Sequence, residues 1–184
     1  VIAVSERLVI DGGRPLSGVI VPSGNKNASL PILAASLLTD EEVVIENVPD
    51  IVDVQTMLAL LDDQSVSIRE VGDNAVALRA ADVRRTDLDA ELCGRLRASL
   101  LLAGPMLARM GAITLPLPGG DVIGGRPLDT HVQALSSLGV EVETNRVGKF
   151  DMHVDDLHGA GFLLLAEASV TATENAIMAA VLAK

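Results

Sequence analysis

Residues 22–38 read PSGNKNASLPILAASLL, and this segment sets the architecture because similar segments occur further along the chain. The counterparts are LCGRLRASLLLAGPMLA at 92–108 and EASVTATENAIMAAVLA at 167–183. Each begins with a polar or charged cluster and continues as a run rich in alanine and leucine, which predicts an apolar helix. The units begin about 70 residues apart, which is longer than the period of common solenoid repeats. The sequence therefore indicates a coarse internal repeat.

The segments between these helices predict an α/β fold. A second helix is expected in the first two units, VDVQTMLALL at 52–61 and LDTHVQALSSLG at 128–139. The expected helices cover residues 27–38, 52–61, 91–109, 129–138 and 173–182. The expected strands, which are rich in β-branched residues, cover 8–10, 18–22, 42–45, 65–69, 75–79, 112–115, 140–143, 150–154 and 162–165. The third unit stops after its first helix, so we expect a piece of a longer chain or completion by another chain.

Composition narrows the class of protein. The chain has 184 residues, 49% of them apolar, enough for one full-sized core or two small ones. A net charge of −11 argues against a nucleic-acid or anionic-membrane partner. No apolar run approaches membrane-spanning length and the first residues lack a secretory signal pattern, so a cytoplasmic location is expected. The single cysteine, Cys93, excludes an internal disulfide and a cysteine-based metal cluster, and a small buried residue is favoured over a nucleophile.

The segment PGGDVIGGRPLD at 118–129 combines four glycines with charged side chains. Glycine is favoured where a backbone turns with positive φ or comes close to a ligand. Asp121 could carry a proton and Arg126 could bind an anion through its fork of donors. The alternative is a pair of tight turns with solvated charges.

Lys26, Arg97 and Arg126 each lie in a stretch that is otherwise poor in charge. A lone cation in such a setting costs desolvation unless an anion compensates it, although each could instead end a helix or form a salt bridge. Three cations in equivalent settings indicate a shared anion site. The polar clusters at 23–27 and 169–173 precede helices, whose N-termini suit anions, and simple N-capping by Asn27 and Thr173 is the alternative.

Five collinear motifs carry a resemblance to a known family: SGNKNASLPILAASLL, VPDIVDV, LRASLLLAGPMLAR, LPGGDVIGGRPLDTH and SVTATENAIMAA. The chain resembles the UDP-N-acetylglucosamine enolpyruvyl transferases, within the enolpyruvyl transferase family that includes the shikimate-pathway enzyme (EPSP synthase). The resemblance implies an inside-out α/β barrel of βαβαββ units, here incomplete. Residues 1–17 would form a strand region of the second domain of the full-length enzyme, and residues 18–184 most of the first catalytic domain.

The resemblance also implies a reaction, the transfer of the enolpyruvyl group of phosphoenolpyruvate to the 3′-hydroxyl of UDP-N-acetylglucosamine. This is the committed step of peptidoglycan synthesis, and it needs no metal or organic cofactor. Both substrates are small molecules, and the C-terminal domain would be the partner that closes the site. The residues carried over by motif are Lys26 and Asn27, Arg97 and Arg126 for phosphoenolpyruvate, Pro127, Leu128 and Asp129 for uridine, and Ser169, Val170 and Thr171 for the diphosphate.

The chain also departs from the family pattern. Asp121 stands where most members have the cysteine that protonates phosphoenolpyruvate and that fosfomycin alkylates, so a fosfomycin-insensitive enzyme is expected. Asn25 replaces an alanine and Thr171 a glycine, which leaves open an enolpyruvyl transferase for another nucleotide. The other alternative is a non-catalytic module that binds anions or a partner, and the isolated chain is not expected to turn over. For His131 a packing role and a catalytic role both stay open, whereas His153 and His158 are expected to be solvated.

Overall fold

The computed structural model describes residues 8–120, 127–144 and 148–184, which form two similar units and one further helix. The first unit contains α1 (Lys26–Ala35), the 3-10 turn η1 (Ser36–Leu38), β1 (Glu42–Ile45), α2 (Val52–Asp63), β2 (Ser67–Gly72) and β3 (Ala75–Arg79). The second contains α3 (Ala90–Arg95), the 3-10 helix η2 (Arg97–Leu102), α4 (Ala103–Met110), β4 (Ala112–Leu115), α5 (Asp129–Ser136), β5 (Glu141–Thr144) and β6 (Phe150–His153). Helix α6 (Val170–Ala180) follows.

The strands of each unit form a three-stranded antiparallel sheet, and both sheets have the same strand order. The orders are β1-β3-β2 and β4-β6-β5, so the last strand of each unit lies between the other two. Val44 pairs with Ala77 in the first sheet, and Thr114 pairs with Asp151 in the second. Because a helical segment, a strand, a second helix and two further strands follow in this order in both units, the internal repeat indicated by the sequence is confirmed.

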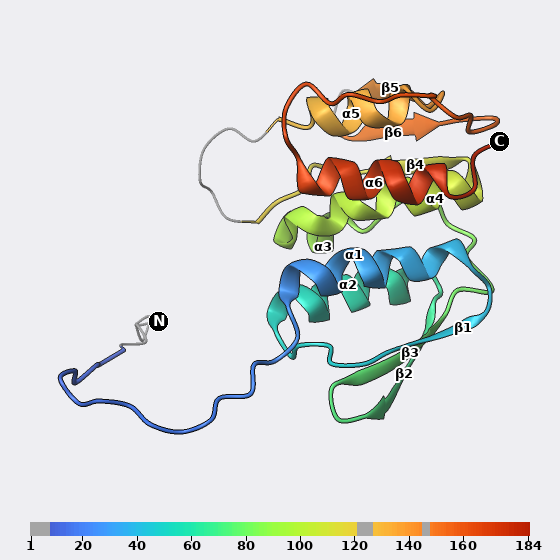
Figure 1. Cartoon of the computed structure of the whole chain (residues 1–184). Coiled ribbons are helices and arrows are strands. Elements are labelled where there is room, and N and C mark those ends of the chain that lie inside the picture. Colours follow the sequence, from blue (N-terminus) through green and yellow to red (C-terminus); the bar gives the residue numbers. More distant parts are fainter. Residues whose placement is uncertain (1–7, 121–126, 145–147) are drawn as a thin grey trace, which may run out of the picture.

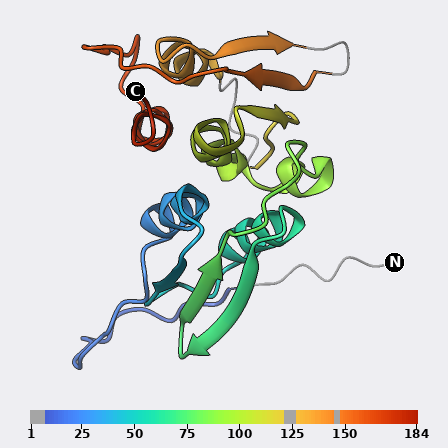
Figure 2. The same ribbon diagram turned by 90° about the vertical axis from the view of Figure 1, so that its right-hand side faces the viewer.

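The helices lie between the two sheets (Figures 1 and 2). One continuous apolar cluster joins both units and includes the fully buried Leu33, Leu60, Leu102 and Leu135. Helix α6 packs against α4 and α5, and α1 packs against α2 and η2. The α/β class and the inside-out arrangement, with helices inside and sheets outside, are therefore confirmed.

Three expected strands are absent. Residues 8–10, 18–22 and 162–165 form no strand, and the first two lie in an exposed extended segment that runs away from the folded body (Figure 1). Their β-branched composition is suited to a sheet, but a strand needs a hydrogen-bonded neighbour, and within the described ranges neither sheet reaches them. Leu8, Val19 and Phe162 accordingly expose most of their surface.

The expected helix over 91–109 is broken into α3, η2 and α4. Leu96 takes an extended conformation, with φ −132° and ψ 113°, and ends α3 before Arg97 begins η2. The N-caps also differ from those expected, since Asn25 and Ser169, rather than Asn27 and Thr173, accept hydrogen bonds from the first turns of α1 and α6. The break at Leu96 redirects Arg97 relative to Arg95.

Two expectations about single residues are confirmed. Cys93 is fully buried, and burial raises the pKa of its thiol to about 11, so it is a packing residue. His153 and His158 are both exposed. In the described part of the chain, no helix has the length and apolar character needed to cross a membrane.

Candidate functional site

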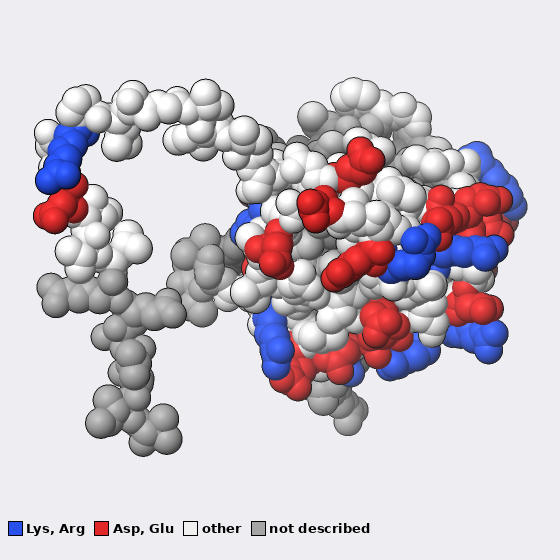
Figure 3. All heavy atoms as spheres, turned by 90° about the horizontal axis from the view of Figure 1, so that it is seen from below, with Lys and Arg blue, Asp and Glu red and all other residues white. Residues whose placement is uncertain are grey.

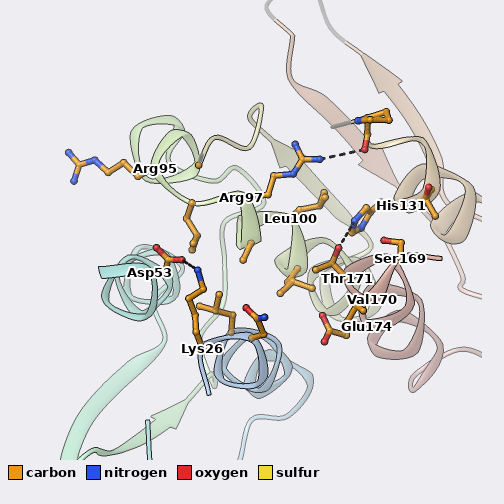
Figure 4. Close-up of a pocket in the computed structure, with 18 of the residues that line it drawn as sticks. Lys26, Asp53, Arg95, Arg97, Leu100, His131, Ser169, Val170, Thr171 and Glu174 are labelled. Carbon is orange, nitrogen blue, oxygen red and sulfur yellow. Dashed lines mark hydrogen bonds and ion pairs between the residues drawn. The ribbon is translucent and has the colours of Figure 1, made fainter. Parts of the chain in front are cut away.

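A cleft of about 630 Å³ opens between the two units, where the N-terminal ends of several helices meet (Figure 4). Its lining comes from the beginnings of α1, η2, α5 and α6, together with Gly120 and Pro127 from the segment before α5. Seven sequence-predicted site residues line it, namely Lys26, Asn27, Arg97, Pro127, Ser169, Val170 and Thr171. Helix N-termini carry unpaired N–H groups and a positive dipole end, so this placement suits an anionic ligand.

Lys26 is the first residue of α1, and its ammonium group pairs with the carboxylate of Asp53 at 2.7 Å. Asp53 lies in the first turn of α2, so the ion pair connects the two helices at the edge of the cleft. Gly24 lets the segment before α1 lie against the segment before α2, because a Cβ there would lie 1.8 Å from the carbonyl oxygen of Asn47. Lys26 keeps about half of its side chain exposed, which leaves its remaining N–H donors accessible to a ligand.

Arg97 begins η2 and points across the cleft toward α5 (Figure 4). Its guanidinium donates to the carbonyl oxygen of Pro127 at 3.5 Å, which connects η2 to the segment that enters α5. Lys26 and Arg97, far apart in the sequence, therefore line one cleft. Arg126 and Asp121 lie outside the described residues.

The glycines at 119 and 120 allow the chain to pass close to α3 and η2, which the sequence analysis did not predict. The N–H of Gly119 donates to the carbonyl oxygen of Cys93, and a Cβ at Gly119 would lie 1.7 Å from the carbonyl oxygen of Gly94. Gly120 has φ +92°, and a Cβ there would lie 3.2 Å from the Cβ and 3.3 Å from the backbone nitrogen of Arg97. The close backbone approach that was expected is present, but here it is made to the chain's own α3 and η2.

Two expected site residues do not line the cleft. The side chain of Leu128 is buried in the core cluster, and Asp129 begins α5 without reaching the cleft. Their neighbours Thr130 and His131 lie there instead. Leu128 precedes an amphipathic helix, so its side chain faces the core.

His131 is buried beneath the cleft and contacts α6 through both ring nitrogens. Nε2 lies 3.1 Å from the hydroxyl of Thr171, and Nδ1 lies 3.1 Å from the amide nitrogen of Asn175. Burial, with a smaller contribution from the charge of Arg97, lowers the pKa of His131 to about 4. The ring is therefore neutral at physiological pH.

Carboxylates line the cleft beside the cations, and sequence reasoning missed them. Glu167 accepts a hydrogen bond from the Thr130 hydroxyl at 3.0 Å, and burial raises the pKa of Glu174. Figure 3 shows acidic and basic side chains interspersed over one face of the molecule, and the chain as a whole has a net charge of −11. Asp53 lies in the first turn of α2, and Glu167 lies just before α6. Within the described ranges no group of three or more histidine, cysteine or carboxylate side chains could hold a metal.

Two solved structures superpose on most of the chain. The enolpyruvyl transferase NikO from Streptomyces tendae superposes with a TM-score of 0.75 at 22% identity, over 94% of this chain and 40% of NikO. EPSP synthase from Acinetobacter baumannii superposes with a TM-score of 0.67 at 17% identity, over 91% of this chain and 38% of the synthase. These structures share the fold of the chain.

Comparison of the sequence with known proteins shows the family to which the chain belongs. The model of the EPSP synthase (3-phosphoshikimate 1-carboxyvinyltransferase) family matches residues 10–184, and the chain belongs to this family. The UDP-N-acetylglucosamine 1-carboxyvinyltransferase of Bradyrhizobium diazoefficiens is 50% identical over 95% of the chain, and that of Treponema denticola is 47% identical over 96%. The chain spans about 40% of the length of these curated relatives.

Proposed function

We propose that this chain carries the first catalytic domain of a UDP-N-acetylglucosamine 1-carboxyvinyltransferase, which acts in the cytoplasm in the committed step of peptidoglycan synthesis. Relatives of that name are 42–50% identical over nearly the whole chain. The observation that carries the proposal is that Lys26 and Arg97 line one cleft at converging helix N-termini. Residues 1–17 would then contribute to a second domain, which supplies the other wall of the site.

The proposed reaction gives a role to each of the site residues predicted from the sequence. Lys26 and Arg97, with Arg126, bind the phosphate and carboxylate of phosphoenolpyruvate, while Asn27 lies beside them. Asp121 delivers a proton to C3 of phosphoenolpyruvate, and the 3′-hydroxyl of the sugar gives its proton to a base of the second domain as its oxygen bonds to C2. The carboxylate of Asp121 then takes a proton back from C3 as the C2–O bond to phosphate breaks, which restores the double bond and releases phosphate.

The α5 and α6 side of the cleft would take the nucleotide sugar. Pro127 and the start of α6 at Ser169, Val170 and Thr171 supply its contacts, with Leu128 and Asp129 placing the turn into α5. Thr171 and Asn25 depart from the family pattern, and these departures leave room for a second candidate, an enolpyruvyl transferase for a different nucleotide. A non-catalytic module that binds anions or a partner is the third.

Phosphate release separates these candidates. The complete gene product should release phosphate from phosphoenolpyruvate when UDP-N-acetylglucosamine is added, and not when the acceptor is omitted. The isolated 184-residue chain should not turn over, because the second wall of the site is missing. Release that requires another nucleotide would support the second candidate, whereas no release with any nucleotide acceptor would contradict the proposed enzyme.

Fosfomycin should leave the complete enzyme active. A carboxylate is a poor nucleophile toward an epoxide, and the chain's one cysteine, Cys93, is buried with a thiol pKa of about 11. With UDP-N-acetylglucosamine present, intact-mass measurement should find no adduct on the wild type and one drug molecule on Asp121→Cys. Rapid inactivation of the wild type, or an adduct on this chain, would refute the assignment of Asp121.

A further inference from the structure

The side-chain amide of Asn175, fully buried in α6, has a fixed orientation. Its Oδ1 lies 2.8 Å from the backbone nitrogen of Gly104, and its Nδ2 lies 2.8 Å from the carbonyl oxygen of Leu100. A peptide N–H can only donate and a carbonyl oxygen can only accept. The amide therefore cannot be flipped without breaking both bonds.

This orientation determines the tautomer of His131. One hydrogen of Asn175 Nδ2 goes to Leu100, and the other points to His131 Nδ1 at 3.1 Å. Nδ1 must accept this hydrogen, so a neutral ring carries its own hydrogen on Nε2. The lowered pKa of His131 agrees with a neutral ring.

The tautomer in turn orients the hydroxyl of Thr171. Nε2 of His131 lies 3.1 Å from Thr171 Oγ1 and donates to it, so the hydroxyl hydrogen must point to a different acceptor. Among the residues that the structure describes, none accepts it. Thr171 is exposed and lines the cleft at the start of α6 (Figure 4).

We propose that Thr171 is a specificity-determining residue, whose hydroxyl is held by Asn175 and His131 as a hydrogen-bond donor to an acceptor oxygen of the nucleotide sugar. The inference rests on the proposed function. It gives a purpose to a side chain that replaces the glycine of the family pattern, where bulk alone would hinder the ligand. Asn175 and His131 are positioning residues, because they act through Thr171.

Two substitutions at residue 171 separate the hydrogen bond from the shape of the side chain. Thr171→Val keeps the shape and removes the donor, and Thr171→Ser keeps the donor and removes a methyl group. In the complete gene product, Thr171→Val should raise the Kd and the KM for UDP-N-acetylglucosamine about 10-fold or more, with a smaller effect on kcat. Thr171→Ser should stay within about 3-fold of the wild type. Equal affinities of the valine variant and the wild type would overturn the proposal.

The tautomer can be read without any ligand. Nitrogen-15 NMR of the wild type, assigned by comparison with His131→Gln, should place the ring hydrogen on Nε2, and a hydrogen on Nδ1 would overturn the relay. If the wild type does not bind UDP-N-acetylglucosamine, the proposed function and the role of Thr171 toward this ligand both fail. The NMR result then decides whether the relay itself exists.

Discussion

Replacing Arg97 with alanine should lower kcat/KM for phosphoenolpyruvate about 100- to 1000-fold in the complete enzyme, the range for loss of one preorganised donor at developing charge. Arg97 directs its guanidinium into the cleft and contacts the carbonyl oxygen of Pro127 (Figure 4). The substitution removes the positive charge that lies near the phosphate and carboxylate of the substrate, and it also removes the contact with Pro127. Steady-state assays of phosphate release at varied phosphoenolpyruvate measure the effect.

Arg95 provides a matched control two residues away. Its side chain is 61% exposed and pairs with Glu91 on its own helix. Arg95 lies at the edge of the cleft, but its guanidinium is directed away from Lys26 and Arg97 (Figure 4). Surface ion pairs of this kind contribute little, so Arg95→Ala should stay within about 2-fold of wild-type kcat/KM. Similar losses in both variants would mean that general charge near α3, rather than the contact made by Arg97, supports catalysis.

The sequence was sufficient for the features that depend on local pattern. Apolar periodicity places the repeated helices, and the glycine and lysine of residues 22–38 identify the start of α1 at the cleft. The absent strands at 8–10, 18–22 and 162–165 show the limit, since a β-branched segment does not say whether a neighbouring strand is available to pair with it. The break at Leu96 was not predicted, because the run 92–108 is apolar enough to form one continuous helix.

The sequence analysis predicted two cations that line the cleft, but it did not predict the carboxylates that lie beside them. Lys26 and Arg97 are conspicuous because each lies in a stretch that is otherwise poor in charge, whereas Asp53 lies in a helix first turn, where a carboxylate is explained by the helix dipole alone. The buried network beneath the cleft depends on the approach of α5, α4 and α6, which are distant in sequence. Only the fold brings His131 to Thr171 and Asn175.

The close packing of α4 against α6 gives the second prediction with a large effect. Gly104→Ala should lower the free energy of unfolding by about 2–4 kcal/mol. A Cβ at Gly104 would lie 2.5 Å from the backbone oxygen of Asn175 and 2.9 Å from its Oδ1. Helices α4 and α6 would have to separate, which weakens the bond from the Gly104 N–H to Asn175 and disturbs the orientation of His131. Urea unfolding of the complete protein measures the change.

Gly94→Ala is the matched control, because Gly94 also lies in a helix but a Cβ there would meet nothing within 4 Å. Alanine loses less conformational entropy than glycine on folding, so this variant should be about 0.5–1 kcal/mol more stable than the wild type. The two glycine substitutions should thus differ in sign. If both stabilise the protein, α4 and α6 do not pack as closely as the Gly104–Asn175 contact requires, and Asn175 could not hold His131 in the tautomer that presents the Thr171 hydroxyl to the cleft.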